Sequence, residues 1–231
     1  MEKEQRYIRF LSDILEFPSV EEADPEGLLA IGGDLSAERL LLAYRSGIFP
    51  WFNDNSPILW WSPDPRMVLF PNKIKISKSM RKVLREGQFK ITKNTCFEEI
   101  MGQCASAKRK DQDGTWITDD MKKAYLGLHE NGYAKSYEVW EAGELVGGLY
   151  GIDLGHVFCG ESMFSLKANA SKFAFIQLAN ELSEKKYKLI DCQLYTDHLA
   201  SLGAEEISRV AFMKLLQEKS LPDQENGSPP F

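Results

Sequence analysis

The chain has 231 residues, a length that fits one large domain or a domain with a smaller companion. Hydrophobic residues make up 43% and charged residues 27% of it, as in an average globular protein, which excludes a disordered or fibrous chain. The 28 basic and 34 acidic residues give a net charge of −6, which argues against a protein that coats nucleic acid nonspecifically.

The start of the chain and its cysteines indicate a compartment. Residues 1–17 lack the basic start and the continuous apolar stretch of a signal peptide, and no apolar run reaches the roughly 18 residues needed to cross a bilayer. The four cysteines form no Cys-x-x-Cys pair, so we expect reduced thiols rather than disulfides or a metal site. We therefore expect a cytoplasmic protein without a membrane partner.

The first 65 residues are predicted to form a small N-terminal domain. Six of the ten prolines lie between Pro18 and Pro65, which favours short elements joined by turns. One helix stands out, because Ser36 is a suitable N-cap and Gly47 follows its apolar stripe.

Longer elements are expected in a second domain that spans residues 66–231. The capping patterns predict three helices: from Ser77 to Gly87, from a capping box at Thr95-x-x-Glu98 toward Ala105, and from Thr118 to a stop at Asn131-Gly132.

Strand patterns follow these helices. Residues 135–140, 145–152 and 157–164, with turns between them, predict an antiparallel meander. A helix over 171–185, a strand over 189–194 and two helical pieces ending near Glu218 come next, and the tail from about residue 221 is expected to be flexible. This order predicts an α+β fold with a mainly antiparallel sheet flanked by helices, in which the last strand joins the meander.

The strand over 189–194 carries two polar residues at the spacing of one face. Side chains alternate along a strand, so Ile190 and Cys192 should face one way and Asp191 and Gln193 the other. We expect Asp191 and Gln193 to project together as a polar pair. The alternative is that they form only the solvent-exposed side of an edge strand.

Glu161 lies within a predicted strand whose two faces are both largely apolar. A carboxylate in such a place needs a partner or a raised pKa. It is therefore a candidate site residue, and the alternative is a structural ion pair with Arg66 or Lys172.

Aromatic residues gather beside proline and glycine, where side chains tend to line loops. They are Tyr44, Phe49, Trp51, Phe52, Trp60, Trp61 and Trp116. Such rings can stack on a nucleobase. An ordinary aromatic core for a small domain is the alternative, above all for Trp60 or Trp61 alone.

A basic stripe extends from Arg66 to Lys93. It holds nine basic residues and one acidic residue in a chain that is acidic as a whole. Lys78, Arg81 and Lys82 of this stripe are candidates for binding RNA phosphates. A solvated helix face is the alternative.

Seven ordered stretches between about Phe17 and Leu216 resemble the leucyl/phenylalanyl-tRNA–protein transferases. They are 27–35 (GLLAIGGDL), 47–52 (GIFPWF), 60–66 (WWSPDPR), 114–118 (GTWIT), 147–151 (GGLYG), 159–164 (CGESMF) and 189–193 (LIDCQ). The resemblance implies a bacterial cytosolic enzyme that moves leucine or phenylalanine, less often methionine, from tRNA to the N-terminal Arg or Lys of a protein. The product would carry an N-end rule degradation signal.

The resemblance also implies a fold and a site. The fold would be a small N-terminal domain followed by a domain similar to the GNAT acyltransferases. Asp191 and Gln193 look like the polar pair at the reacting centre, and Glu161 looks like a carboxylate near the acceptor or the 3′ end. The other implied contacts to the aminoacyl-adenosine are Tyr44, Trp51 and Trp116 for the adenosine and Leu149, Phe158, Met163 and Ile190 for the amino-acid side chain.

No cofactor is expected for this chemistry, because an aminoacyl ester is already an activated acyl donor. In this hypothesis Asp191 holds Gln193 and draws positive charge from the amine, while the Gln193 amide oxygen accepts an N–H bond and aims the nitrogen lone pair at the ester. Lys78, Arg81 and Lys82 would then contact tRNA phosphates.

Two other functions are weighed against this one. An acyl-CoA-dependent GNAT N-acetyltransferase should have a Gly-rich turn for pyrophosphate between the third meander strand and the next helix, but no glycine occurs from Glu161 to Leu202. A non-enzymatic RNA-binding module would need the basic stripe but not Asp191, Gln193 and Glu161.

Overall fold

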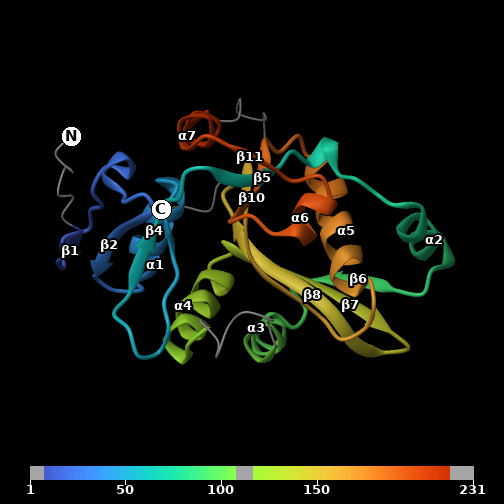
Figure 1. Ribbon diagram of the computed structural model, residues 1–231. Helices are drawn as coiled ribbons and strands as arrows, with labels where there is room; N and C mark the ends of the chain where they lie inside the picture. Colours follow the sequence, from blue (N-terminus) through green and yellow to red (C-terminus); the bar gives the residue numbers. More distant parts are fainter. Residues whose placement is uncertain (1–7, 108–116, 219–231) are drawn as a thin grey trace, which may run out of the picture.

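The computed structural model describes residues 8–107 and 117–218, which form two β-sheets with helices around them (Figure 1). This arrangement confirms the predicted α+β fold with a small N-terminal part and a larger, mainly antiparallel sheet. The tail that was expected to be flexible from about residue 221 lies outside the described residues. In the two described ranges, every helix is too short or too polar to span a membrane.

The first sheet has four short strands in the order β1-β2-β4-β3. β1 runs parallel to β2, and the other neighbours are antiparallel. The Ser36 side chain accepts a hydrogen bond from the backbone N–H of Arg39, so it caps the helix of this region as predicted. The elements are β1 (Arg9–Leu11), a 3-10 turn η1 (Val20–Glu22), β2 (Leu28–Gly32), α1 (Ala37–Arg45), β3 (Phe49–Pro50) and β4 (Leu59–Trp61).

The second sheet has seven strands in the order β11-β5-β10-β9-β8-β7-β6. Its strands are β5 (Arg66–Leu69), β6 (Lys90–Lys93), β7 (Ala134–Glu141), β8 (Glu144–Asp153), β9 (Val157–Ser165), β10 (Leu189–Gln193) and β11 (Glu205–Ile207). The predicted meander is β7, β8 and β9. The last predicted strand joins it as β10, parallel to β9 and antiparallel to β5. Sequence reasoning missed β5, β6 and β11, which are too short to show a period of two.

The helices of the second part begin where their caps predict, with one exception. Ser77 caps α2 and Thr118 caps α4. The capping box at Thr95 is wrong: α3 begins after Cys96, and the Thr95 hydroxyl instead donates to Glu138 Oε2 at 2.9 Å. The remaining elements are η2 (Pro71–Lys73), α2 (Lys78–Glu86), α3 (Phe97–Ser106), α4 (Asp119–Glu130), α5 (Ala170–Glu184), α6 (Asp197–Ser201) and α7 (Arg209–Gln217).

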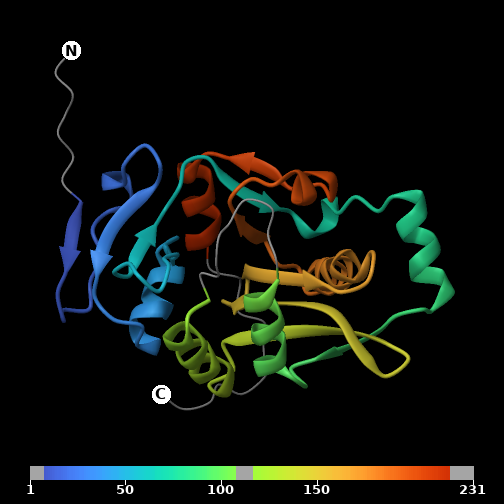
Figure 2. The same cartoon turned by 60° about the horizontal axis from the view of Figure 1, so that its bottom comes forward.

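Helices cover both faces of the second sheet (Figures 1 and 2). α5 buries its apolar side chains against one face, together with Leu149, Phe158 and Ile190 of the strands. α3 and α4 pack on the other face with Tyr150 and Cys159. The end of the molecule remote from the first sheet is formed by α2.

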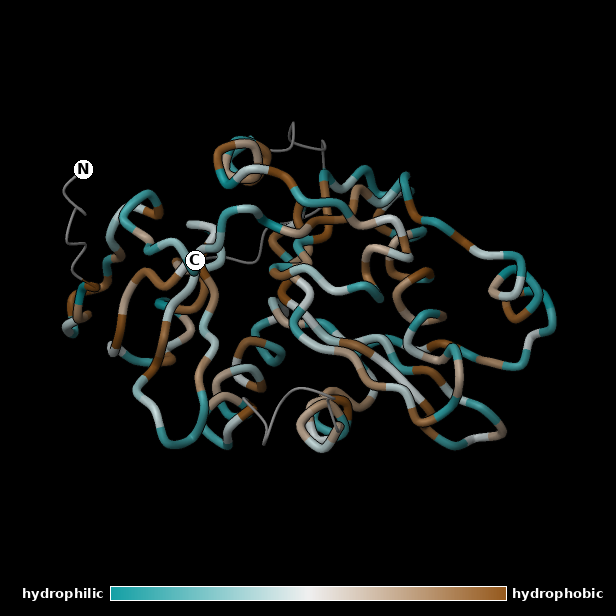
Figure 3. The backbone as a smooth tube through the Cα atoms, viewed as in Figure 1, coloured by the Kyte–Doolittle hydropathy of each residue, from teal (hydrophilic) through white to brown (hydrophobic). Residues whose placement is uncertain are grey.

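The two sheets share one hydrophobic cluster, which contains residues of α1 and β4 as well as residues of α3, α4 and β8. Hydrophobic and hydrophilic residues alternate along the chain in both parts, as expected for elements that each bury one face (Figure 3). The division into domains 1–65 and 66–231 stays a prediction, with the two sheets lying on either side of residue 65.

Candidate active site

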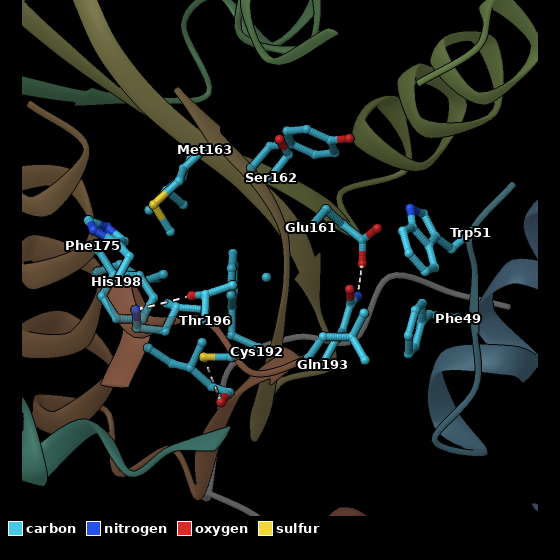
Figure 4. Close-up of a pocket in the computed structure, with 18 of the residues that line it drawn as sticks. Phe49, Trp51, Glu161, Ser162, Met163, Phe175, Cys192, Gln193, Thr196 and His198 are labelled. Carbon is cyan, nitrogen blue, oxygen red and sulfur yellow. Dashed lines mark hydrogen bonds between the residues drawn. The ribbon is translucent and has the colours of Figure 1, made fainter. Parts of the chain in front are cut away.

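A pocket of about 580 Å³ lies where strands β9 and β10 separate (Figure 4). The two strands pair only over 157–159 and 189–191, and the rest of β9 pairs with β8 alone. Residues 160–163 of β9 therefore form one wall of the pocket, and residues 192–196, at and just after the end of β10, form another. Phe49 and Pro50 of β3 and the next residue, Trp51, approach from a third side.

Two β-bulges lie beside this pocket. Tyr150 pairs with Ser162 and Gly151 pairs with Gly160, so Glu161 is an extra residue in β9. Asp191 pairs with Val68 and Gln193 pairs with Met67, which leaves one extra residue between them in β10. A bulge bends a strand and changes where its side chains point.

The bulge in β10 explains why the prediction that Asp191 and Gln193 share a face is wrong. Cys192 is the extra residue, so the alternation of side chains is interrupted between its two neighbours. Gln193 also has a φ of 64°, in the left-handed region. Gln193 therefore lines the pocket, whereas the described residues that line it do not include Asp191.

Asp191 lies behind the pocket wall, in an ion pair with Arg66. Both side chains are about 1% exposed, and the guanidinium donates two hydrogen bonds, Nε to Oδ1 at 2.8 Å and Nη2 to Oδ2 at 2.7 Å. Asp191 Oδ1 also accepts the backbone N–H of Gln193 at 3.0 Å. Asp191 holds Gln193 as expected, but it does so through the Gln193 backbone N–H. The Asp191 carboxylate, which we expect from the sequence to face the amine, is instead neutralised by Arg66.

Glu161 is the carboxylate that reaches the pocket. Its Oε1 accepts a hydrogen bond from Gln193 Nε2 at 2.8 Å, and its Oε2 accepts one from the Tyr125 hydroxyl at 3.0 Å. The Tyr125 hydroxyl is in turn hydrogen-bonded to that of Tyr44. The alternative of an ion pair between Glu161 and Arg66 is wrong, because Arg66 pairs with Asp191.

Burial sets the protonation of Glu161. The side chain is 9% exposed, and this desolvation raises its pKa from 4.5 to about 7, with a further increase from the charge of Asp191. Hydrogen bonds from Tyr44, Tyr125 and Gln193 oppose the increase. A carboxyl group with such a pKa can accept or release a proton near neutral pH.

The apolar walls gather the four residues predicted for the side-chain pocket. Leu149, Phe158, Met163 and Ile190 all line it. Phe49, one of the aromatic residues expected to line loops, also lines it, whereas sequence reasoning missed others, among them Phe175, Leu178, Cys192, Tyr195 and His198. Helical spacing marks Phe175 and Leu178 as buried positions of α5, but it does not show which cavity they face. Phe175 and His198 lie at the opposite end of the pocket from Trp51 (Figure 4).

The three aromatic residues predicted to hold adenosine have different places. Trp51 lines the pocket and contacts Trp61 edge to face, with ring centroids 5.7 Å apart. Tyr44 is only 2% exposed, so its ring belongs to the core and its predicted role as a stacking platform is wrong. Trp116 lies outside the described residues.

The basic residues predicted to contact tRNA phosphates lie on α2, at the far end of the molecule from the first sheet (Figure 2). Lys78, Arg81 and Lys82 are exposed, and Lys82 pairs with Glu86 on the next turn. Their role stays a prediction.

The arrangement can bind an apolar side chain and present two polar groups at one end. Among the residues that the structure describes, no three His, Cys, Asp or Glu side chains gather so as to hold a metal ion. The Gln193 amide can accept an N–H bond through its oxygen while its nitrogen donates to Glu161. This geometry suits the orientation of an amine beside an activated ester.

Comparisons with family models and with known proteins all point to one family. The family model of leucyl/phenylalanyl-tRNA protein transferase matches residues 68–217, and the model of the N-terminal domain of that family matches residues 33–64. The leucyl/phenylalanyl-tRNA–protein transferase of Flavobacterium johnsoniae is 61% identical over 210 residues, which cover 91% of this chain and 99% of that protein. The transferase of the same name from Pseudomonas putida is 56% identical over 206 residues, which cover 88% and 91% of the two chains.

Solved structures show a weaker similarity. A GCN5-related N-acetyltransferase from Kribbella flavida matches with a TM-score of 0.38 and 11% identity, covering 71% of this chain and 58% of that one.

Proposed function

The chain belongs to the leucyl/phenylalanyl-tRNA–protein transferase family, and we propose that the pocket between β9 and β10 is the site of its aminoacyl transfer. As an aminoacyltransferase of this family it uses aminoacyl-tRNA and protein substrates. The observation that carries the proposal is an apolar pocket with a hydrogen-bonded pair, Glu161 and Gln193, at one end. This pair faces Trp51 (Figure 4).

The donor substrate needs little chemical help. An aminoacyl ester is activated, and an α-amino group with a pKa of about 7.7 to 8.0 is neutral in roughly a tenth or more of molecules at pH 7. Holding the neutral amine against the ester carbonyl can therefore supply much of the acceleration.

Gln193 orients the amine. Its Nε2 donates to Glu161, which leaves the amide oxygen to accept an N–H of the amine and to direct the nitrogen lone pair at the carbonyl carbon. An amide is too weak a base to remove a proton, so its contribution is geometric.

Glu161 takes the charge that the reaction creates on nitrogen. Attack forms the C–N bond and a positively charged nitrogen, whose proton passes to the Glu161 carboxylate. The bond between the carbonyl carbon and the 3′ oxygen then breaks, and that oxygen takes a proton from the neighbouring ribose hydroxyl or from water. A carboxyl pKa of about 7 suits this transfer.

The transferred side chain occupies the apolar part of the pocket. Leu149, Phe158, Met163 and Ile190 surround it, and each methylene that a smaller side chain lacks weakens binding by about 1 to 3 kcal/mol. The adenosine at the 3′ end would lie against Trp51. Leucine and phenylalanine are therefore preferred to small residues, with methionine as a further substrate.

The acceptor is a protein with an N-terminal Arg or Lys, which becomes a degradation signal once it is aminoacylated in the cytoplasm. An acidic group beside the pocket supports this choice. Tyr195 lines the pocket, is 54% exposed and donates to the Asp197 carboxylate at 2.9 Å. Asp197 thus adjoins the pocket through Tyr195, and its carboxylate can attract a basic N-terminal residue.

Acyl-CoA chemistry has less support, because two backbone N–H groups at the start of α5 are already hydrogen-bonded within the protein. The backbone N–H of Ala170 already donates to Lys167 O at 3.1 Å, and that of Ser171 donates to Ser165 Oγ at 3.2 Å. A pyrophosphate cradle needs such N–H groups to be available.

Transfer of labelled leucine tests the proposal. The protein is incubated without ATP with labelled leucyl-tRNA and a peptide that begins with Arg, and in parallel with acetyl-CoA and the same peptide. We expect label on the Arg peptide from leucyl-tRNA, none on an N-acetylated copy of the peptide, and no acetyl transfer. Acetyl transfer, or no leucyl transfer to the free peptide, contradicts the proposal.

A further inference from the structure

Arg66 is a buried cation that the reaction above does not use. It lies on β5 and is 1% exposed. A buried charge is costly unless paired and hydrogen-bonded, and Arg66 meets this need with two parallel bonds to the Asp191 carboxylate, at 2.8 and 2.7 Å. This two-point contact fixes the orientation of both groups, as a single bond would not.

The rest of the guanidinium contacts the first sheet. Nη1 donates to the backbone oxygen of Gly47 at 3.3 Å. The Cζ atom lies 4.7 Å from the ring centroid of Phe49 and 4.7 Å from that of Phe212, so aromatic rings lie near it from both β3 and α7. Phe49 lines the pocket and precedes Trp51 by two residues.

The other end of this contact chain is the residue that orients the amine. Asp191 Oδ1 accepts the backbone N–H of Gln193 as well as the Arg66 Nε–H. Gln193 has a φ of 64°, a left-handed conformation that is strained for a non-glycine residue. Such a conformation persists when its surroundings hold it, and the Asp191 carboxylate supplies one of those contacts.

We propose that Arg66 is a positioning residue for aminoacyl transfer, which sets the distance between the Trp51 wall and the Gln193 amide. The inference rests on the proposed function, because the two walls matter only if the ester lies against one and the amine against the other. Arg66 touches neither substrate. It acts through Asp191 toward Gln193 and through Gly47 and Phe49 toward Trp51.

This role predicts a specific kinetic effect. If the contacts of the Arg66 guanidinium are weakened, the pocket walls remain and leucyl-tRNA still binds. The amine and the ester, however, are no longer aligned. A misplacement of about 1 Å can lower a rate by about 100-fold. An ion pair with a purely structural role would lower stability and leave the turnover of the folded protein unchanged.

The test compares Arg66→Lys with Arg39→Lys. Lysine keeps the charge but loses the planar two-point contact and the stacking. Arg39 is the matched control, because it is also 1% exposed and pairs with Asp34, but it lies in the first sheet region and lines no described part of the pocket. For Arg66→Lys we expect kcat to fall about 10- to 100-fold, with KM for leucyl-tRNA within about twofold. For Arg39→Lys we expect unchanged kcat per folded molecule.

Three outcomes of the lysine comparison overturn the inference: unchanged kcat in Arg66→Lys, an equal loss of kcat in both lysine variants, or a loss confined to KM. If Arg66→Lys does not fold, Asp191→Asn replaces it, and the same split between kcat and KM is required. Where Arg66→Lys and Asp191→Asn both fold, the variant that combines them should lose no more kcat than the worse of the two, because both residues act through one contact. Additive losses of kcat overturn the inference. Failure of the wild-type protein to transfer leucine would instead refute the proposed function.

Discussion

Replacing Glu161 by glutamine is expected to stabilise the protein while it removes activity, and the gain should increase with pH. Glu161 is 9% exposed, and burial is the main cause that raises its pKa from 4.5 to about 7. Above pH 7 the folded protein therefore holds a charge in a place that disfavours it. Glutamine has nearly the same shape and carries no charge, so Glu161→Gln removes this cost.

The sign and size follow from the two pKa values. Because the folded pKa is raised, the stabilising contribution of the carboxyl is fully present below the unfolded value of 4.5 and is lost as the pH rises through about 7. The difference, 7 minus 4.5, is about 2.5, and at 1.36 kcal/mol for each pKa unit it corresponds to about 3 kcal/mol. Most of this loss, about 2 to 3 kcal/mol, should fall between pH 5 and pH 8.

Urea unfolding of both proteins at pH 5, 6, 7 and 8 measures the effect. Changes in hydrogen bonding at residue 161 shift the free energy of unfolding equally at each pH, so only the pH-dependent part of the difference is compared. Glu98→Gln, which removes an exposed carboxylate of α3, controls for a general loss of negative charge. A difference between wild type and Glu161→Gln that stays constant or shrinks from pH 5 to pH 8 would refute the reasoning.

Three further predictions concern the pocket, the sheet and the tRNA. Met163→Phe narrows the pocket and should lower phenylalanyl transfer about tenfold more than leucyl transfer in a competition assay; an equal effect on both would remove Met163 from the side-chain site. Gly151→Ala places a Cβ 2.2 Å from a backbone oxygen of β9 and should lower the free energy of unfolding in urea by about 1 to 3 kcal/mol or more, the cost of overpacking a core; a variant as stable as the wild type would contradict this geometry. Reversing Lys78, Arg81 and Lys82 to Glu should weaken tRNA binding at low salt, and unchanged affinity there would exclude α2 from the interface.

Local signals in the sequence predicted local structure well. Ser36, Ser77 and Thr118 cap their helices because a cap needs only a side-chain oxygen and a backbone N–H three residues away. Thr95 failed as a cap because its hydroxyl bonds to Glu138, 43 residues along the chain, and no local pattern reports such a partner.

The residues of the candidate site could be predicted better than their arrangement. The four apolar residues carried over from the family motifs meet in one pocket with Glu161 and Gln193. The alternation of side chains along a strand did not predict where Asp191 points, because the bulge at Cys192 interrupts that alternation. The hydrogen bond from Tyr125 to Glu161 joins residues 36 apart, and the bonds from Arg66 to Asp191 join residues 125 apart. Contacts of this kind depend on the tertiary fold, which neither spacing nor composition records.

Single-turnover transfer by Gln193→Gly tests the central claim, that the cleft accelerates the reaction by orienting the amine. Glycine tolerates the φ of 64° at this position, so the variant removes the amide and leaves the backbone unstrained. With saturating leucyl-tRNA and an Arg peptide, we expect the rate of peptide-bond formation to fall about 100-fold while the Kd for leucyl-tRNA stays within about twofold. An unchanged rate, or a loss that appears only as weaker leucyl-tRNA binding, would contradict the account.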